Sequence, residues 1–189
     1  MGTRSPDLAE IMARLPQESL PPVHLWNPPA GSDIDMRIAR DGTWFYQGTP
    51  IRRAPMVRLF STVLRHEEDG RFYLVTPVEK LAITVEDAPF LAVGMTVHGS
   101  GRGQVLQFRT NVDSEIVAGP DHPIRVSVDA ESEEPAPYLL VRDRLEALIA
   151  RAVFYDLVEL AEEREVDGRI ELGVWSAGRY FPLGLGEDV

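Results

Sequence analysis

The basic residues between positions 52 and 80 are the side chains of this sequence best suited to bind a ligand. Arg52, Arg53 and Arg58 lie close together in the chain, and Lys80 follows in the same segment. A guanidinium group can donate two parallel hydrogen bonds to a phosphate or a carboxylate. Because the formal net charge is −11, an anion is held only where local donors outweigh the general field. The sequence therefore predicts that a small ligand is anionic and lies beside these four residues.

Three aromatic residues, Trp44-Phe45-Tyr46, precede these arginines. Alternation along a strand turns one ring away from the other two, so an outward Trp44 or Tyr46 offers a stacking face to a nucleobase or a similar ring. Two alternatives stay open. The rings can instead cover the adjoining helix, and the basic residues can pair with carboxylates of the same segment. These carboxylates are Glu67, Glu79, Glu86 and Asp87.

No pattern of catalytic or metal-binding residues stands out. The chain has no cysteine, its four histidines are widely scattered, and its serines lack the surroundings of a catalytic nucleophile. Paired carboxylates are expected by chance among 30 acidic residues. The sequence predicts no catalytic residue, no metal and no cofactor; whether the protein is an enzyme stays open, and a non-enzymatic role is favoured.

Charge and hydropathy limit the classes of partner. Residues 88–189 carry 9 basic and 18 acidic residues, which disfavours bulk binding of DNA or RNA. No apolar run is long enough for a membrane span, and the N-terminus lacks the apolar core of a signal peptide. A cytoplasmic protein without a membrane partner is predicted.

The elements expected to position Arg52, Arg53, Arg58 and Lys80 are a helix and two strands between Gly48 and Phe90. Pro55 suits the first turn of a helix that begins near Ala54 and carries apolar residues at helical spacing through Leu64. Asp69-Gly70 ends the helical region, and strands are expected over residues 72–75 and 81–85. Upstream, residues 34–38 and 43–46 read as a hairpin across Asp41-Gly42.

For the second half of the chain, the sequence predicts mainly strands and then a long helix. Strands are expected near residues 91–98, 105–108, 116–117 and 124–128, with a turn at Gly99–Gly103 and a solvated loop at Ser127–Pro137. A helix over Arg142–Arg164 then runs through acidic residues into Asp167-Gly168-Arg169 and two strands. This repeats the order of helix, Asp-Gly-Arg and two strands, which indicates duplication.

The predicted fold is α+β, with two consecutive similar domains whose antiparallel sheets each pack on one helix. The predicted divisions are a leader helix and linker over residues 1–22, a first repeat domain over 23–87, and a larger second domain over 88–189. An apolar stripe in the leader is expected to pack on its own chain or on a second copy, as in a homodimer. Its residues are Leu8, Ile11, Met12 and Leu15.

Several motifs resemble the bacterial domain of unknown function 1285 family. They are His24-Leu25-Trp26-Asn27-Pro28, the run Gly48–Phe60, the run Leu74–Lys80, and Val85-Glu86-Asp87-Ala88-Pro89-Phe90. The resemblance implies two structurally related domains, the second superficially like a pleckstrin-homology domain. It also implies a nucleotide-like ligand at their interface and a role in signalling.

Two functions follow as expectations. The first is a ligand-binding or signalling module that takes a small anionic, nucleotide-like ligand in a cleft between the duplicated domains. The second is a protein-interaction module in which the acidic second domain binds a basic protein partner.

Overall fold

The structure is a computed structural model that describes residues 20–128 and 134–185. The chain divides into two compact units, of which unit 1 ends at Asp87 and unit 2 begins at Ala88. No helix within the described residues is long and apolar enough to cross a membrane. The residues of the predicted leader stripe lie outside the described residues: Leu8, Ile11, Met12 and Leu15.

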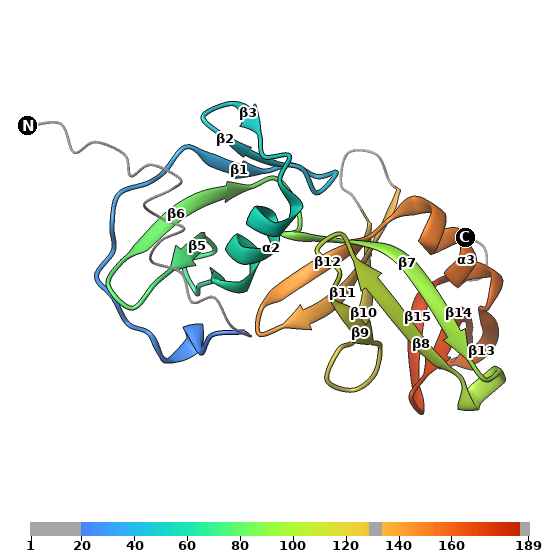
Figure 1. Cartoon of the computed structure of the whole chain (residues 1–189). Coiled ribbons are helices and arrows are strands. Elements are labelled where there is room, and N and C mark those ends of the chain that lie inside the picture. The colour runs from blue at the N-terminus through green and yellow to red at the C-terminus, as the bar shows by residue number, and fades with distance from the viewer. Residues whose placement is uncertain (1–19, 129–133, 186–189) are drawn as a thin grey trace, which may run out of the picture. The chain divides into compact units, whose positions relative to one another are not determined.

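Unit 1 is a six-stranded sheet with one α-helix and a short 3₁₀ helix in its described part. In chain order the elements are η1 (Val23–Leu25), β1 (Met36–Ile38), β2 (Trp44–Tyr46), β3 (Thr49–Pro50), α2 (Ala54–Thr62), β4 (Leu64–His66), β5 (Phe72–Val75) and β6 (Lys80–Val85). The strand order is β3-β2-β1-β6-β5-β4 (Figure 1). Strands β1 and β6 are parallel, and the other neighbours are antiparallel.

Helix α2 begins as its sequence predicts but ends early. Pro55 lies in the first turn, where a missing N–H leaves no intrahelical bond unmade. Phe60 is buried, and its ring stacks on Trp44 with 6.2 Å between the ring centroids. The helix ends at Thr62, because the chain then enters strand β4, where Leu64 pairs with Leu74 of β5.

Two Asp-Gly pairs form turns of unit 1, as predicted. Gly42 and Gly70 have φ of 84° and 78°, a conformation that glycine adopts at little cost. In each turn the aspartate accepts a backbone N–H two residues later, at 2.9 Å. The predicted hairpin of β1 and β2 is confirmed, and the second turn joins β4 to β5.

Unit 2 contains a second six-stranded sheet, a helix and a separate three-stranded sheet. Its elements are β7 (Phe90–His98), η2 (Gly101–Gly103), β8 (Val105–Thr110), β9 (Glu115–Val117), β10 (Ile124–Val128), β11 (Pro135–Arg142), β12 (Leu145–Ile149), α3 (Arg151–Glu159), β13 (Glu162–Val166), β14 (Arg169–Ser176) and β15 (Arg179–Leu185). The larger sheet has the order β10-β11-β12-β7-β8-β9, and the smaller one β13-β14-β15.

The two six-stranded sheets share one topology. When β1–β6 are matched in order with β7–β12, the strand order is the same, and the first and last strands form the central parallel pair in both. Duplication is therefore confirmed for the sheets. The repeat of helix, Asp-Gly-Arg and two strands that indicated it is wrong, since Asp167-Gly168-Arg169 joins β13 to β14 of the separate three-stranded sheet. Their antiparallel character was predicted wrongly, since each is mixed. The helices also differ in place, because α2 precedes the fourth strand of its sheet and α3 follows the sixth.

The long helix predicted over Arg142–Arg164 is wrong. Only Arg151–Glu159 is helical; Leu145–Ile149 forms β12 and Glu162–Val166 forms β13. Alternate residues of β12 are buried, so the same apolar stripe also fits a strand. The predicted solvated loop is likewise too long, since β11 already begins at Pro135.

A buried serine joins the small sheet to the large one within unit 2. The Ser176 hydroxyl donates to the Ala118 carbonyl at 2.7 Å and accepts the Leu106 N–H at 2.9 Å. The Gln104 side chain adds a hydrogen bond to the Trp175 carbonyl at 2.9 Å. These bonds satisfy polar groups that would otherwise be buried at a cost.

Candidate functional site

The predicted basic residues lie in two different settings of unit 1. Arg52 and Arg53 come directly before α2, and Arg58 lies on α2; all three are exposed. Neither the Arg52 nor the Arg53 side chain forms an ion pair or a hydrogen bond with another residue that the structure describes. Lys80 begins β6, where it is paired with Glu67. The structure thus leaves two arginines open to a ligand and commits the lysine elsewhere.

The aromatic residues also separate. Trp44 is 1% exposed and stacks on Phe60 of α2, so it covers the helix and offers no free ring face. Phe45 points the other way, where the Arg37 guanidinium lies 4.2 Å from its ring centroid. Tyr46 is half-buried, and its hydroxyl accepts the Gln47 side-chain N–H at 3.3 Å. The expectation that Trp44 offers a stacking face is therefore wrong, and Tyr46 is the remaining candidate.

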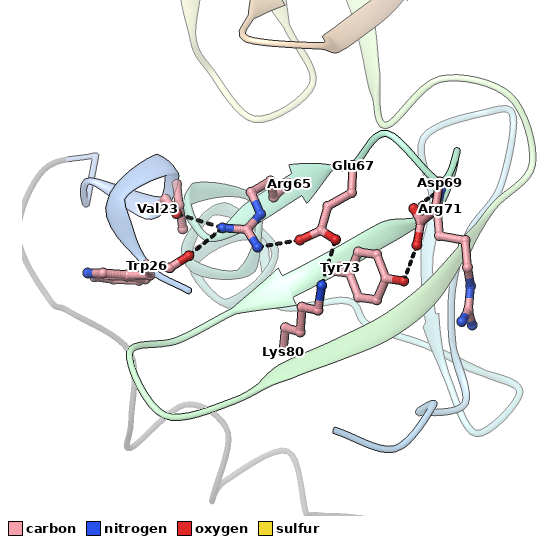
Figure 2. A network of polar contacts seen from close by, with 8 residues as sticks. All are labelled: Val23, Trp26, Arg65, Glu67, Asp69, Arg71, Tyr73 and Lys80. Carbon is pink, nitrogen blue, oxygen red and sulfur yellow. Dashed lines mark hydrogen bonds and ion pairs between the residues drawn. The ribbon is translucent and has the colours of Figure 1, made fainter. Parts of the chain in front are cut away.

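Lys80 belongs to a network of polar contacts that we call the unit 1 network (Figure 2). Its residues are Val23, Trp26, Arg65, Glu67, Asp69, Arg71, Tyr73 and Lys80. Lys80 Nζ lies 2.6 Å from Glu67 Oε2, and Arg65 contacts the other oxygen of this carboxylate. Arg65 Nη1 also donates to the carbonyls of Val23 and Trp26, at 3.0 and 2.7 Å. The three charged side chains are only 17–20% exposed. They therefore tie η1 and the residue after it to the edge strand β4.

Burial and hydrogen bonding act against each other on Glu67. Burial disfavours its charged form, but hydrogen bonds from Lys80 and Arg65, together with their charges, hold the pKa of Glu67 below its ordinary value of 4.5. At the other end of the network, the Tyr73 hydroxyl donates to Asp69 at 2.6 Å. This bond, with the Arg71 N–H, also lowers the pKa of Asp69. Both carboxylates are thus held ionised by the network itself.

The partners within the unit 1 network indicate a structural role. Each of its cations faces a carboxylate, including Arg71, which pairs with Asp33 at 2.9 Å. Lys80 also lies 4.7 Å from the Tyr73 ring centroid, a cation–π distance. Such a network has little capacity left for an external anion. It holds together segments that carry the family motifs, among them Trp26 and Lys80.

A hollow of about 370 Å³ lies on one face of β7, β8 and β9 in unit 2. The residues around it are Gly94, Met95, Thr96, His98, Gln107, Phe108, Arg109 and Glu115. A chain of hydrogen bonds crosses the three strands: His98 Nε2 to Gln107 Oε1 at 2.9 Å, then Gln107 Nε2 to Glu115 Oε2 at 2.8 Å. Arg109 donates to Asp113 at 3.4 Å. The hollow therefore carries charges of both signs.

The hollow has no counterpart among the sequence predictions. Its polar residues recur at every second position of β7 and β8, as on any solvent-facing side of a sheet. Only the pairing of β8 with β9 brings Glu115 to Gln107 and Arg109, and no local signal shows that pairing. No group of three or more histidine, cysteine, aspartate or glutamate side chains in the described ranges could hold a metal ion.

Two family matches cover most of the chain. Residues 21–88 match the DUF1285 N-terminal domain, and residues 89–183 match the DUF1285 C-terminal domain. Both are described as domains of unknown function. The chain belongs to the DUF1285 family. The resemblance of the sequence motifs is thereby confirmed.

Solved structures of DUF1285 proteins resemble this one. A family protein from Silicibacter pomeroyi DSS-3 is 54% identical, with a TM-score of 0.90, and the match covers 97% of this chain and 98% of that chain. A second, from Shewanella baltica OS155, is 28% identical with a TM-score of 0.52, over 66% of this chain and 90% of that one. A comparison with curated proteins gives no match.

Proposed function

We propose that this DUF1285 protein is a ligand-binding module, with a role in signalling, that holds a small anionic ligand at Arg52 and Arg53. The observation that carries the proposal is the contrast among the basic residues of unit 1. Several of them contact carboxylates: Arg37, Arg40, Arg65, Arg71 and Lys80. Arg52 and Arg53 have no such partner in the described part of the chain.

Unpaired arginines have a specific value in a protein with a net charge of −11. The general field repels anions, so a bound anion needs donors that no internal carboxylate already occupies. Arg58, exposed on α2, is the predicted third member of the site, and Tyr46 is the predicted stacking partner. A phosphate group for the arginines and a flat ring for the tyrosine together define a nucleotide-like ligand.

The family resemblance adds two finer parts to this proposal. It predicts that unit 2 is superficially like a pleckstrin-homology domain and that the ligand lies in a cleft between the two domains. Both stay predictions. The residues that support the anion site all belong to unit 1, so its test does not depend on either.

A thermal-shift screen of ATP, inorganic triphosphate, adenosine and small dicarboxylates tests the anion site. A ligand at 100 times its Kd adds about 2.7 kcal/mol, which corresponds to about 5–11 °C in Tm for a chain of this size. We expect ATP and triphosphate to stabilise the protein and adenosine alone to have little effect. The double variant Arg52→Ala/Arg53→Ala should lose at least about tenfold in affinity.

Arg169→Ala is the control, since it removes an exposed arginine at the start of β14 in unit 2. It should bind as the parent does. If no anion stabilises the parent, or if the double variant binds as tightly as the parent, the site is wrong.

A second candidate function is the binding of a basic protein partner, and strand β13 favours it. Among the described residues β13 pairs only with β14, and four of its five residues are exposed. Its exposed residues include Glu162, Glu163 and Glu165. An unpaired strand edge can take an added strand, and its acids would favour a basic one.

A lysine-rich extended peptide tests this candidate by fluorescence anisotropy. Binding should weaken strongly between low and high salt, and Glu163→Lys/Glu165→Lys should weaken it further. Glu115→Lys/Asp121→Lys, at exposed positions on β9 and in the loop after it, changes the net charge by the same amount and is the control. Equal loss in both variants would attribute binding to the general field and exclude β13.

A further inference from the structure

We propose that the hollow on the β7, β8 and β9 face of unit 2 binds a small zwitterion of the free amino acid class. This inference does not depend on the anion site in unit 1. The volume of the hollow, about 370 Å³, lies near the lower end of the range for ligand pockets, which runs from ~300 to ~1,000 Å³. The hollow therefore suits a ligand of few atoms.

Two opposite charges that face each other across the hollow do not pair. Arg109 and Glu115 are direct partners in the register of β8 and β9, where opposite charges normally attract. Glu115 instead accepts a hydrogen bond from Gln107 at 2.8 Å, and Arg109 reaches Asp113 only at 3.4 Å. The two side chains thus diverge and leave a cation and an anion at the rim of one hollow.

Both charges keep bonding capacity for a ligand. A guanidinium group has five N–H donors, and a single long bond to Asp113 uses one of them. The Glu115 carboxylate has used Oε2. Arg109 suits a ligand carboxylate, and Glu115 suits an ammonium group beside it. An α-amino acid carries these two groups on one carbon atom, which matches their placement on neighbouring strands.

Gly94 lies beneath the arginine. It is the register partner of Arg109, and a β-carbon built on it would lie 3.7 Å from Arg109 Nη2. The guanidinium group therefore lies over a backbone that has no side chain of its own.

The hydrogen-bond chain holds Glu115 in place. A carboxylate only accepts, so Gln107 must turn its NH₂ group toward Glu115 and its oxygen toward His98. His98 Nε2 then carries the proton that this oxygen accepts. Glu115 is consequently ordered before a ligand arrives, which lowers the entropy cost of binding.

Titration of the full-length ¹⁵N-labelled protein with each of the twenty common amino acids tests the proposal by NMR. At about 10 mM, ten times a Kd of 1 mM, at least one amino acid should shift the amide signals of Thr96, Gln107 and Glu115. Acetate and methylamine each carry one of the two charges. They should bind at least about tenfold more weakly.

Variants locate the site. Arg109→Gln and Glu115→Gln should each weaken binding about tenfold or more, whereas the exposed controls Arg169→Gln and Glu163→Gln should leave it unchanged. The double variant Arg52→Ala/Arg53→Ala should also keep amino acid binding, so this site and the anion site can fail separately. The proposal is overturned if no amino acid shifts these signals, or if acetate binds as tightly as the amino acid.

Discussion

The two units use their charged residues in opposite ways. In the unit 1 network, Arg65, Glu67 and Lys80 are about four-fifths buried, and Glu67 contacts both cations. In the hollow of unit 2, Arg109 and Glu115 are exposed and, though opposite in register, do not contact. The two sheets share one topology, so the fold itself does not impose this difference.

The difference separates charges that stabilise the fold from charges free to bind. A half-buried ion needs a complete set of partners, because an unpaired one costs several kcal/mol. An exposed ion stays hydrated and needs none. The family motifs place Trp26 and Lys80 in the first group. Membership of a motif is therefore weaker evidence for a binding site than an exposed charge that keeps bonding capacity beside a hollow.

The largest expected effect is that of Glu67→Ala, which breaks the unit 1 network at its centre. It leaves Arg65 and Lys80 without their shared carboxylate while both stay about four-fifths buried. We expect the free energy of unfolding in urea to fall by about 2–4 kcal/mol. The control Glu163→Ala, on an exposed strand, should change it by less than about 0.5 kcal/mol. Equal effects of the two variants would show that the network does not stabilise unit 1.

The parts of the fold that were predictable from the sequence depend on local geometry. Pro55 begins a helix and Gly70 accepts a positive φ whatever the rest of the chain does. The prediction of a helix over Arg142–Arg164 was wrong because the apolar residues fit both the helical and the strand periodicity. The turn before β12 is at Asp143, which has φ of 46° without a glycine beside it, so the usual hairpin signal is missing.

The candidate sites were predictable only in part, for a similar reason. Arg52 and Arg53 are neighbours in the chain, so their clustering is visible in the sequence. The partner that commits Lys80 to the unit 1 network lies 13 residues away, and Trp44 is set inward by strand pairing. Both outcomes depend on contacts between segments, which composition and spacing do not fix.

The next effect in size is the response of the same network to acid. The folded pKa of Glu67 is lower than 4.5, so the unfolded chain takes up the proton first as pH falls. The stabilisation is complete above about pH 5 and is lost as pH falls through the lowered pKa. Urea unfolding from pH 6 to pH 3 should show a steeper loss for the parent than for Glu67→Gln. Parallel pH profiles would mean that Glu67 titrates alike in both states.

A smaller effect is expected at the exposed end of the network. Tyr73→Phe removes the hydroxyl that donates to Asp69 at 2.6 Å and leaves the ring beneath Lys80 in place. A loss of about 1 kcal/mol is expected, as for one hydrogen bond. The control is Tyr46→Phe, which removes a hydroxyl that accepts the Gln47 side-chain N–H over a longer distance, 3.3 Å. If Tyr46→Phe costs as much as Tyr73→Phe, the bond to Asp69 has no special weight.

The smallest expected effect is the coupling between Arg109 and Glu115, measured by a double-mutant cycle with Arg109→Gln and Glu115→Gln. Coupling energy reports contact, and these two side chains are bonded to other residues although the register makes them opposite. We expect a coupling below about 0.3 kcal/mol in the free energy of unfolding. Arg125 and Glu146 provide the matched pair in the same unit, with two hydrogen bonds of 2.7 and 2.6 Å. Their coupling should reach about 0.5–1 kcal/mol, because a bidentate geometry is the favourable case for an exposed ion pair. A coupling as large at Arg109 and Glu115 as at Arg125 and Glu146 would mean that Arg109 and Glu115 pair with each other in solution. Neither charge would then be available to a ligand in the hollow.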